Sequence, residues 1–354
     1  MRRSRPSRPA LRALFAGAAL CALAAPLAAQ RAAATTPADA RRLMEAIAHD
    51  SLEGRLTGTR GAQKAAQLIA REMRRIGLQP AEGDGFLQRV PIVMMPGRNG
   101  GPLRPALAPA FAALDTVPAE RRPEAANVIG WLRGTDPALR DEYIIVGSHY
   151  DHVGINAARA VDGDSIFNGA DDDASGVVAM LEVARQLKAA PPKRSVLFVA
   201  FVGEENGMTG TRWFIQHPSR PLAQVVADLQ VEMIGRPDSL AGGAGKGWLT
   251  GFERSTMGEA LAAAGVPIIA DPRPAQNFFS RSDNYPFALE GIPAHTISSF
   301  GGHADYHGVN DEADRIDYDH IAAVINATAK AVRLLGDGPR PEWKPGGKPE
   351  RRAP

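Results

Sequence analysis

Short apolar runs that alternate with helical segments constrain the fold of this chain more than any other feature of its sequence. Helical segments, notably Ala174–Leu187 and Asp319–Leu335, alternate with several apolar runs that are rich in β-branched residues. Buried strands interleaved with helices are typical of a sheet that is covered on both faces. The sequence therefore predicts an α/β fold with a mixed, mostly parallel central sheet and helices on both faces. The apolar runs are Val128–Trp131, Tyr143–Gly147, Val196–Val202, Val225–Met233 and Ala294–Ser298.

Two helices are predicted before this alternating region. One covers Ala38–His49, and a strongly amphipathic one covers Gly61–Ile76, with Gly77 as its C-cap. Residues 80–123 are rich in Pro and Gly, which favours edge strands and loops. Since α/β chains of this length commonly fold as one unit, we expect a single domain over residues 30–337.

The two ends of the chain have compositions unlike the rest. Residues 1–29 combine a basic start, an apolar run from about Ala13 to Leu27 and small residues at Ala28 and Ala29. This pattern is typical of a secretory signal peptide, and the run is too short to span a membrane. We expect cleavage near Ala29 and export to the periplasm or the extracellular space, with no membrane segment in the mature form. Residues 338–354 are rich in Pro, Gly and charged residues, which predicts a disordered tail.

Charge and cysteine content narrow the choice of partners and metal ligands. The net charge is +2 and the basic residues concentrate at the two ends, so the sequence has no footprint for nucleic-acid binding. Cys21 is the only cysteine, and it leaves with the signal peptide. Any metal in the mature chain must therefore be held by imidazole and carboxylate groups.

Histidine and acidic residues follow four of the predicted strands at the point where each strand ends. In open α/β sheets the ligand crevice lies outside the carboxyl ends of the strands, so we expect these side chains to converge on one cleft. Two surface glutamates after a core strand would account for Glu204 and Glu205 alone, but not for the other strand ends. The residues are His149, Asp151 and His152 after the first strand, Glu204 and Glu205 after the second, Glu232 after the third, and His303 and His307 after the fourth.

The segment Asn168–Gly176 carries three consecutive aspartates just before a predicted helix. Acidic residues at a helix N-terminus cap free N–H groups and favour the helix dipole, which accounts for Asp173. Capping accounts poorly for Asp172 if the surrounding small residues hold the segment beside His149. A dication would relieve the repulsion between the carboxylates and could use Asp172 as a bridge.

Taken in order, these motifs resemble those of the co-catalytic two-zinc aminopeptidase family. This family includes bacterial leucyl-type aminopeptidases, and its relatives include glutamate carboxypeptidases and glutaminyl cyclases. The resemblance runs from about residue 40 to residue 335 and implies a zinc exopeptidase-like fold, a sandwich of the phosphorylase/hydrolase-like type. The matching stretches are Leu52–Gly58, His149-x-Asp151, Gly163–Phe167, Asn168–Gly176, Glu204-Glu205, Glu232 before Met233-Ile-Gly-Arg236, and Tyr306-His307-Gly-Val-Asn-Asp311.

The resemblance implies two Zn²⁺ per chain and a role for each residue of the cleft. Glu204 would be the general base that activates a metal-bridging water, and Asp151 would fix the tautomer of a ligand imidazole. Imidazole and carboxylate oxygen are both ligands that zinc accepts. The implied ligands are His149 and Glu232 for one zinc, Glu205 and His307 for the other, and Asp172 as the bridge.

Two details of the family pattern bear on this chain. The family has a cis peptide bond after the bridging aspartate, which here is the Asp172–Asp173 bond. It also usually has aspartate where this chain has Glu232. The extra methylene keeps the charge and the donor atoms, so we expect zinc binding to survive.

The remaining polar residues near the motifs receive other roles. We expect His303 to be a loop residue near the cleft and His152 to be structural or to lie behind a ligand. Asp283 resembles a family residue that could orient His307. Ordinary surface or packing positions are expected for His49, His217, His295 and His320.

Sequence and resemblance together predict an exported zinc-dependent exopeptidase, a metallopeptidase that acts on peptide substrates and releases N-terminal residues. Two alternatives stay open, a glutaminyl-peptide cyclase with one zinc and a catalytically inactive binding module of the same fold. Retention of both glutamates and both histidines favours two metals and hydrolysis. The preferred substrate residue, the native metal, the choice between aminopeptidase and carboxypeptidase action and the oligomeric state are left open by the sequence.

Overall fold

The structure is a computed structural model that describes residues 34–81, 83, 85–97 and 101–351. Nine strands within these residues form one mixed sheet. They are β1 (Gln79–Pro80), β2 (Leu87–Arg89), β5 (Ala126–Leu132), β6 (Tyr143–His149), β9 (Ser195–Phe201), β10 (Val225–Val231), β11 (Gly247–Leu249), β12 (Ile268–Ala270) and β13 (Ala294–Ser298).

The strand order is β1-β5-β9-β6-β10-β13-β11-β12, with β2 also paired to β5. The four central strands β9, β6, β10 and β13 are parallel to one another, and antiparallel pairing begins at β5 on one side and at β11 on the other. Two short two-stranded sheets stand apart, β3 (Ile92–Pro96) with β4 (Leu103–Leu107), and β7 (Gly154–Ile155) with β8 (Ile166–Phe167).

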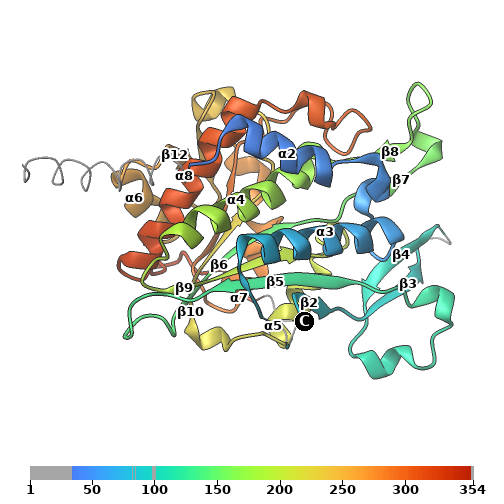
Figure 1. The fold of residues 1–354 in the computed structure, drawn as a ribbon, viewed down its shortest axis with the longest axis horizontal. Coiled ribbons are helices and arrows are strands. Elements are labelled where there is room, and N and C mark those ends of the chain that lie inside the picture. Colours follow the sequence, from blue (N-terminus) through green and yellow to red (C-terminus); the bar gives the residue numbers. More distant parts are fainter. Residues whose placement is uncertain (1–33, 82, 84, 98–100, 352–354) are drawn as a thin grey trace, which may run out of the picture. The chain divides into compact units, whose positions relative to one another are not determined.

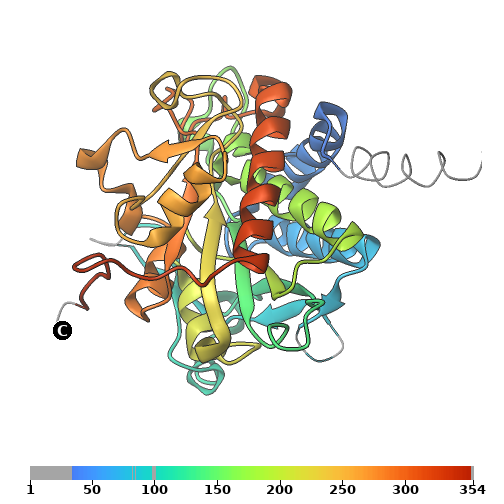
Figure 2. The same cartoon turned by 90° about the vertical axis from the view of Figure 1, so that its left-hand side faces the viewer.

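Helices cover both faces of the central sheet (Figure 1). Four helices pack on one face and against one another, and Figure 2 shows α8 in red beside α2 and α4. Helices α5 and α7 contact each other on the opposite face, and α6 (Thr256–Ala263) contacts β12. The predicted fold class is therefore confirmed. The first group is α2 (Pro37–Ile47), α3 (Arg60–Ile76), α4 (Ser175–Ala189) and α8 (Tyr318–Asp337); the second is α5 (Thr209–Gln216) and α7 (Asn284–Leu289).

The central strands are apolar on both sides because both sides are covered. In β6, Ile144 and Val146 belong to the core beneath the four-helix layer, whereas Tyr143 and Ile145 belong to the core beneath α5 and α7. All seven residues of β6 are buried. Each large apolar side chain removed from water in this way contributes about 1.5–3 kcal/mol, so the strands that carry the cleft are anchored on two sides.

The two N-terminal helices confirm the local reading of the sequence. Helix α3 ends at Gly77, which has the left-handed φ of 85° expected of a C-cap. Thr59 caps its other end by accepting a hydrogen bond from the Ala62 N–H.

Among the described residues, no helix combines the length and the apolar character needed to cross a membrane.

The C-terminal segment differs from its prediction. Residues 338–351 do not form a disordered tail but pack against the domain. The Trp343 indole donates to the Gly291 carbonyl at 2.9 Å, and the Lys344 N–H donates to the Arg254 carbonyl at 2.9 Å. Composition pointed to disorder, but Trp343 anchors the segment by packing against Phe279 and His295. Residues 352–354 and the predicted signal peptide lie outside the described residues.

Candidate metal centre

Four strands of the sheet deliver their polar residues to one place. His149 is the last residue of β6, and it is paired in parallel register with Phe201, the last residue of β9. Glu204 and Glu205 follow β9, and Glu232 follows β10 directly. Because parallel neighbours end at the same edge of the sheet, the predicted convergence of these strand ends is confirmed.

Asp172 lies at the centre of the cluster and presents one carboxylate oxygen to each half of it. Its Oδ1 is 3.3 Å from Nε2 of His149, and its Oδ2 is 3.0 Å from Nε2 of His307. Glu232 Oε1 lies 3.8 Å from the same His149 nitrogen. A carboxylate with a different imidazole at each oxygen has the geometry of a bridge between two cations.

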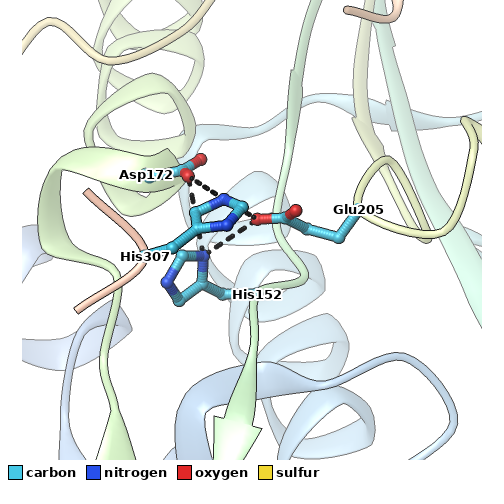
Figure 3. Close-up of side chains that lie close together, drawn as sticks. All are labelled: His152, Asp172, Glu205 and His307. Atoms are coloured by element: carbon cyan, nitrogen blue, oxygen red, sulfur yellow. Dashed lines mark hydrogen bonds and ion pairs between the residues drawn. The ribbon is translucent and has the colours of Figure 1, made fainter. Parts of the chain in front are cut away.

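The second half of the cluster contains one side chain more than the sequence predicted (Figure 3). His307 Nε2 is 3.0 Å from Glu205 Oε1. His152 Nδ1 lies 3.2 Å from the same glutamate oxygen and 3.8 Å from Asp172 Oδ2. The donor atoms of His152, Asp172, Glu205 and His307 all lie within 4.8 Å of one another, as do those of His149, Asp172 and Glu232 in the first half.

The three consecutive aspartates have three separate tasks. Asp171 accepts the Gly235 N–H at 2.6 Å and bonds to His303 at 2.8 Å. Asp173 accepts the Gly176 N–H at 2.9 Å, which caps α4 as predicted, and also the N–H groups of His149 and Met233. Only Asp172 is left to face the cleft. The Asp172–Asp173 peptide bond is cis, as the resemblance implied.

Asp151 acts differently from the prediction. Its carboxylate is 3.8 Å from Nδ1 of His149, too far for a hydrogen bond, and that nitrogen instead lies 3.1 Å from the Asp151 backbone carbonyl. The carboxylate accepts the N–H groups of Gly203 and Glu204 at 2.8 and 3.1 Å and the Thr57 hydroxyl at 2.9 Å. The main chain of Asp151 therefore orients His149, and its side chain holds the turn that carries Glu204.

Two residues that support the cluster were not singled out from the sequence. The Arg55 guanidinium is fully buried and donates to the carbonyls of Tyr150, Ile47, Asn168 and Gly169. Asp311 accepts the N–H groups of Asp171 and Asp172, each at 3.0 Å. Both positions stand inside matching stretches, Leu52–Gly58 and Tyr306–Asp311, but spacing alone does not reveal which buried carbonyl or amide a side chain will meet.

Glu204 lines a pocket of about 240 Å³ beside the cluster. Burial raises the pKa of its carboxyl group well above the usual value, and the neighbouring Glu232 carboxylate adds to the effect. Two dications nearby would lower that pKa again, because they favour the charged form. The group can therefore change its protonation state when the local charge changes, which a general acid–base catalyst requires.

The carboxylates of the cluster favour the protonated, positively charged forms of its imidazoles. Burial alone would lower the pKa of His307, but Asp172 and Glu205 raise it to about 10. Burial would likewise lower the pKa of His149, and Asp172 and Glu232 raise it well above its usual value. Metal cations can meet the same demand while the imidazoles stay neutral and act as ligands.

The ring nitrogens fit a metal better than they fit direct hydrogen bonds. Nε2 of His149 and Nε2 of His307 are both buried and make no hydrogen bond of acceptable geometry within the described residues, although carboxylate oxygens lie 3.0–3.3 Å away. An N–H that misses a nearby oxygen gains little. Lone pairs that converge on a point between the atoms are the arrangement that zinc needs. The residues present therefore fit a pair of metal ions.

Two turns with left-handed backbone conformation orient the candidate ligands Glu232 and His307. His307 has a φ of 53° and Met233, which follows Glu232, has a φ of 49°. Such left-handed values are uncommon for residues other than glycine and often occur at functional sites. At Met233 the chain turns away directly after β10, which leaves Glu232 facing the cleft.

The other predicted roles have mixed outcomes. His303 is a loop residue beside the cleft, as expected, where it contacts Asp171. Asp283 hydrogen-bonds to Thr211 and not to His307, so the prediction that it orients His307 is wrong. His295 and His320 are buried packing residues, and His217 stacks on Trp213.

Comparison with known proteins gives an independent reading of the chain. The family model described as "Peptidase family M28" matches residues 127–332. A probable leucine aminopeptidase 2 from Aspergillus fumigatus is 25% identical over 311 residues, which cover 81% of this chain and 56% of that protein. A probable zinc metalloprotease from Pyrenophora teres f. teres is 34% identical over 109 residues, which cover 31% of this chain and 22% of that protein. The chain thus matches less than two thirds of the length of these relatives.

Solved structures extend the likeness to the whole fold. A zinc aminopeptidase from Bacillus subtilis, BSAP, aligns with a TM-score of 0.61 over 85% of this chain and 96% of its own, at 17% identity. An aminopeptidase from Aneurinibacillus sp. strain AM-1 aligns with the same TM-score over 91% and 99% of the two chains, also at 17% identity. At this identity the likeness shows a shared fold.

Proposed function

Because the chain belongs to peptidase family M28, we propose that it is a zinc aminopeptidase that hydrolyses the first peptide bond of its substrates. The single observation that carries the proposal is the position of Asp172, with His149 at one carboxylate oxygen and His307 at the other. The names of the relatives agree, since they include leucine aminopeptidases and zinc metalloproteases.

Two zinc ions per chain are proposed. His149 and Glu232 would hold one, Glu205 and His307 the other, and Asp172 would bridge them. Glu232 replaces the shorter aspartate of the family pattern, and the 3.8 Å between its Oε1 and the His149 nitrogen supports its reach to the site. When bound, a pair of zinc ions supplies Lewis acidity toward the scissile carbonyl and lowers the pKa of water.

The protein's own groups supply the proton transfer. Glu204 lines the same pocket as Asp172, Glu205 and Glu232, so its carboxylate can take the proton of an attacking water molecule. The same carboxyl group can then pass that proton to the leaving amine. Asp151 fixes the N–H groups of Gly203 and Glu204, so the base is held in place through the main chain.

The pocket supports exopeptidase action on an apolar first residue. Its walls include Met208, Trp248, Phe278 and Phe300, and its volume of about 240 Å³ is below the roughly 300–1,000 Å³ of sites for drug-sized ligands. One side chain fits such a space. The carboxylates of Glu204 and Glu232, which also line it, would favour the ammonium group of a free N-terminus.

We further propose that the enzyme is exported. The proposal rests on the basic start, the apolar run and the small residues of positions 1–29. N-terminal sequencing of protein secreted by an expressing cell would give a new terminus near Ala29. An intact Met1 terminus in the cell interior would contradict export.

A substrate panel tests the proposed function. The full chain, loaded with zinc, is assayed with leucyl, phenylalanyl, glutamyl and lysyl peptides, each with a free and an acetylated N-terminus. We expect hydrolysis of the free leucyl and phenylalanyl peptides and none of the acetylated ones. Release of C-terminal residues would contradict aminopeptidase action, and cyclisation of an N-terminal glutamine without hydrolysis would replace the proposal with a cyclase.

A further inference from the structure

We infer that His152 is a direct metal ligand, the fourth protein donor in the half of the centre that contains Glu205 and His307. The inference rests on the proposed two-metal function. Its starting point is that His152 Nδ1 lies 3.2 Å from Glu205 Oε1 and 3.8 Å from Asp172 Oδ2 (Figure 3). These are the two oxygens that His307 Nε2 also approaches, each at 3.0 Å.

The spacing of the four donors matches one ion. Zinc bonds to nitrogen and oxygen are about 2.0–2.1 Å long, and in a tetrahedron such bonds place neighbouring donors roughly 3.3 Å apart. The nitrogen–oxygen separations in this half are 3.0, 3.0, 3.2 and 3.8 Å and scatter around that value. The two imidazoles lie edge to face, at 80° with ring centroids 5.4 Å apart, so they approach the shared oxygens without stacking.

His152 is held in this position by its surroundings. The side chain is fully buried, and a Cβ atom added at Gly169 would lie 2.5 Å from its Cδ2 atom, so the ring packs directly on that glycine. Gly169 has a φ of 54°, a value that also disfavours any larger residue there. Arg55 fixes both sides of the contact, because its side chain binds the Gly169 carbonyl and its own carbonyl accepts the His152 N–H.

A fourth ligand makes the two halves unequal. Structural zinc sites have four protein ligands, whereas catalytic sites have three and keep one position open. The half with His152 has four donors, and the half with His149, Asp172 and Glu232 has three. The four-donor half therefore holds its ion more tightly, and the three-donor half keeps the open position for the substrate.

Cadmium NMR tests the bond itself. The metal-free full chain, labelled with ¹⁵N-histidine, is titrated with ¹¹³Cd²⁺, which reports each bonded nitrogen as a coupling. We expect the first equivalent to couple to two imidazole nitrogens, one of them Nδ1 of His152. His152→Ala should remove one coupling and weaken the tighter site at least tenfold. The matched control His303→Ala, which removes a histidine bonded to Asp171 beside the same cluster, should keep both.

Two outcomes would overturn the inference and are distinguishable. If Nδ1 of His152 keeps its proton while His307 couples to cadmium, His152 only donates a hydrogen bond to Glu205. The fourth ligand is then wrong, and the proposed function stands. If no cadmium binds at Glu205 and His307, the proposed two-metal function fails as well.

Discussion

Two buried histidines, His295 and His320, differ from the cluster histidines His149 and His307 in how their rings are completed. His295 has Ser255 Oγ 2.7 Å from Nε2 and the Thr250 carbonyl 2.7 Å from Nδ1. His320 accepts the Gly245 N–H at Nδ1 and bonds to Ser299 Oγ at Nε2. In contrast, Nε2 of His149 and of His307 has no hydrogen bond of acceptable geometry within the described residues.

This difference distinguishes histidines that only pack in the core from histidines that can bind a metal ion. A buried polar atom without a partner costs about 1–3 kcal/mol, so a ring that serves packing is bonded at both nitrogens. His149 at the end of β6 and His307 in the loop after β13 each leave a ring nitrogen close to carboxylate oxygens, and a metal ion would complete these nitrogens. The packing pair are His295 and His320, and the metal pair are His149 and His307. Amino-acid substitutions and removal of the metals test this division.

Replacing the bridge should have the largest effect. Asp172→Asn removes the charge that both halves share, so we expect both metals to be lost. Peptidase activity should fall by roughly a thousandfold or more, which exceeds the 10–100-fold loss typical of residues that only hydrogen-bond to metal ligands. Asp228→Asn is the matched control, because Asp228 is equally buried but bonds to Gln230 in β10. Elemental analysis and initial rates of both variants check the prediction. If Asp172→Asn retained two metals, Asp172 would not be the bridging ligand.

Replacing the proposed base should separate catalysis from metal binding. Glu204→Gln keeps the size of the side chain and removes its basicity, so activity should fall by about 10²–10⁴-fold while two metals remain bound. Glu142→Gln, which alters a glutamate paired with Arg194 and Arg340 away from the cleft, serves as the control. Unchanged turnover in Glu204→Gln would show that another group moves the proton.

Removing the metals should destabilise the native chain but not the bridge variant. Ions that bind only the folded state stabilise it by about 2.7 kcal/mol at a hundred times their Kd. A chelator should therefore lower the Tm of the wild type and leave that of Asp172→Asn unchanged. Calorimetry with and without the chelator measures the shift. An equal shift in both proteins would mean that the ions act elsewhere.

His295 should give the smallest effect, and it concerns folding alone. Burial lowers its pKa to about 4 from the usual 6.5. Between these values the unfolded chain binds a proton that the folded chain does not, so stability falls as pH drops, by about 1.4 kcal/mol per pH unit from this group. In metal-free protein, denaturant titrations from pH 7 to pH 4 should show a shallower loss for His295→Gln. Equal slopes would mean that His295 is protonated when folded.

The sequence was most informative where a local pattern or a general rule of sheet topology determines the structure. Strand β13 was predicted with the bounds it has, because a β-branched run between turn residues fits little else. The convergence of His149, Glu205 and His307 followed from strand ends in a parallel sheet, a rule of topology that needs no side-chain detail.

The failures all concern contacts between distant segments. The carboxylate of Asp151 holds the Gly203–Glu204 turn, 52 residues away, and no local pattern encodes that partner. His152 lies beside Glu205 only because the carboxyl ends of β6 and β9 are neighbours. The tail was misread for the same reason, since the packing of Trp343 against His295 depends on the folded domain.

A crystal structure of the full chain grown with zinc, with data collected on both sides of the zinc absorption edge, would locate the bound ions. We predict two anomalous peaks flanking the Asp172 carboxylate, one within bonding distance of His149 and Glu232 and the other of Glu205 and His307. A single peak, or zinc bound away from Asp172, would contradict the account.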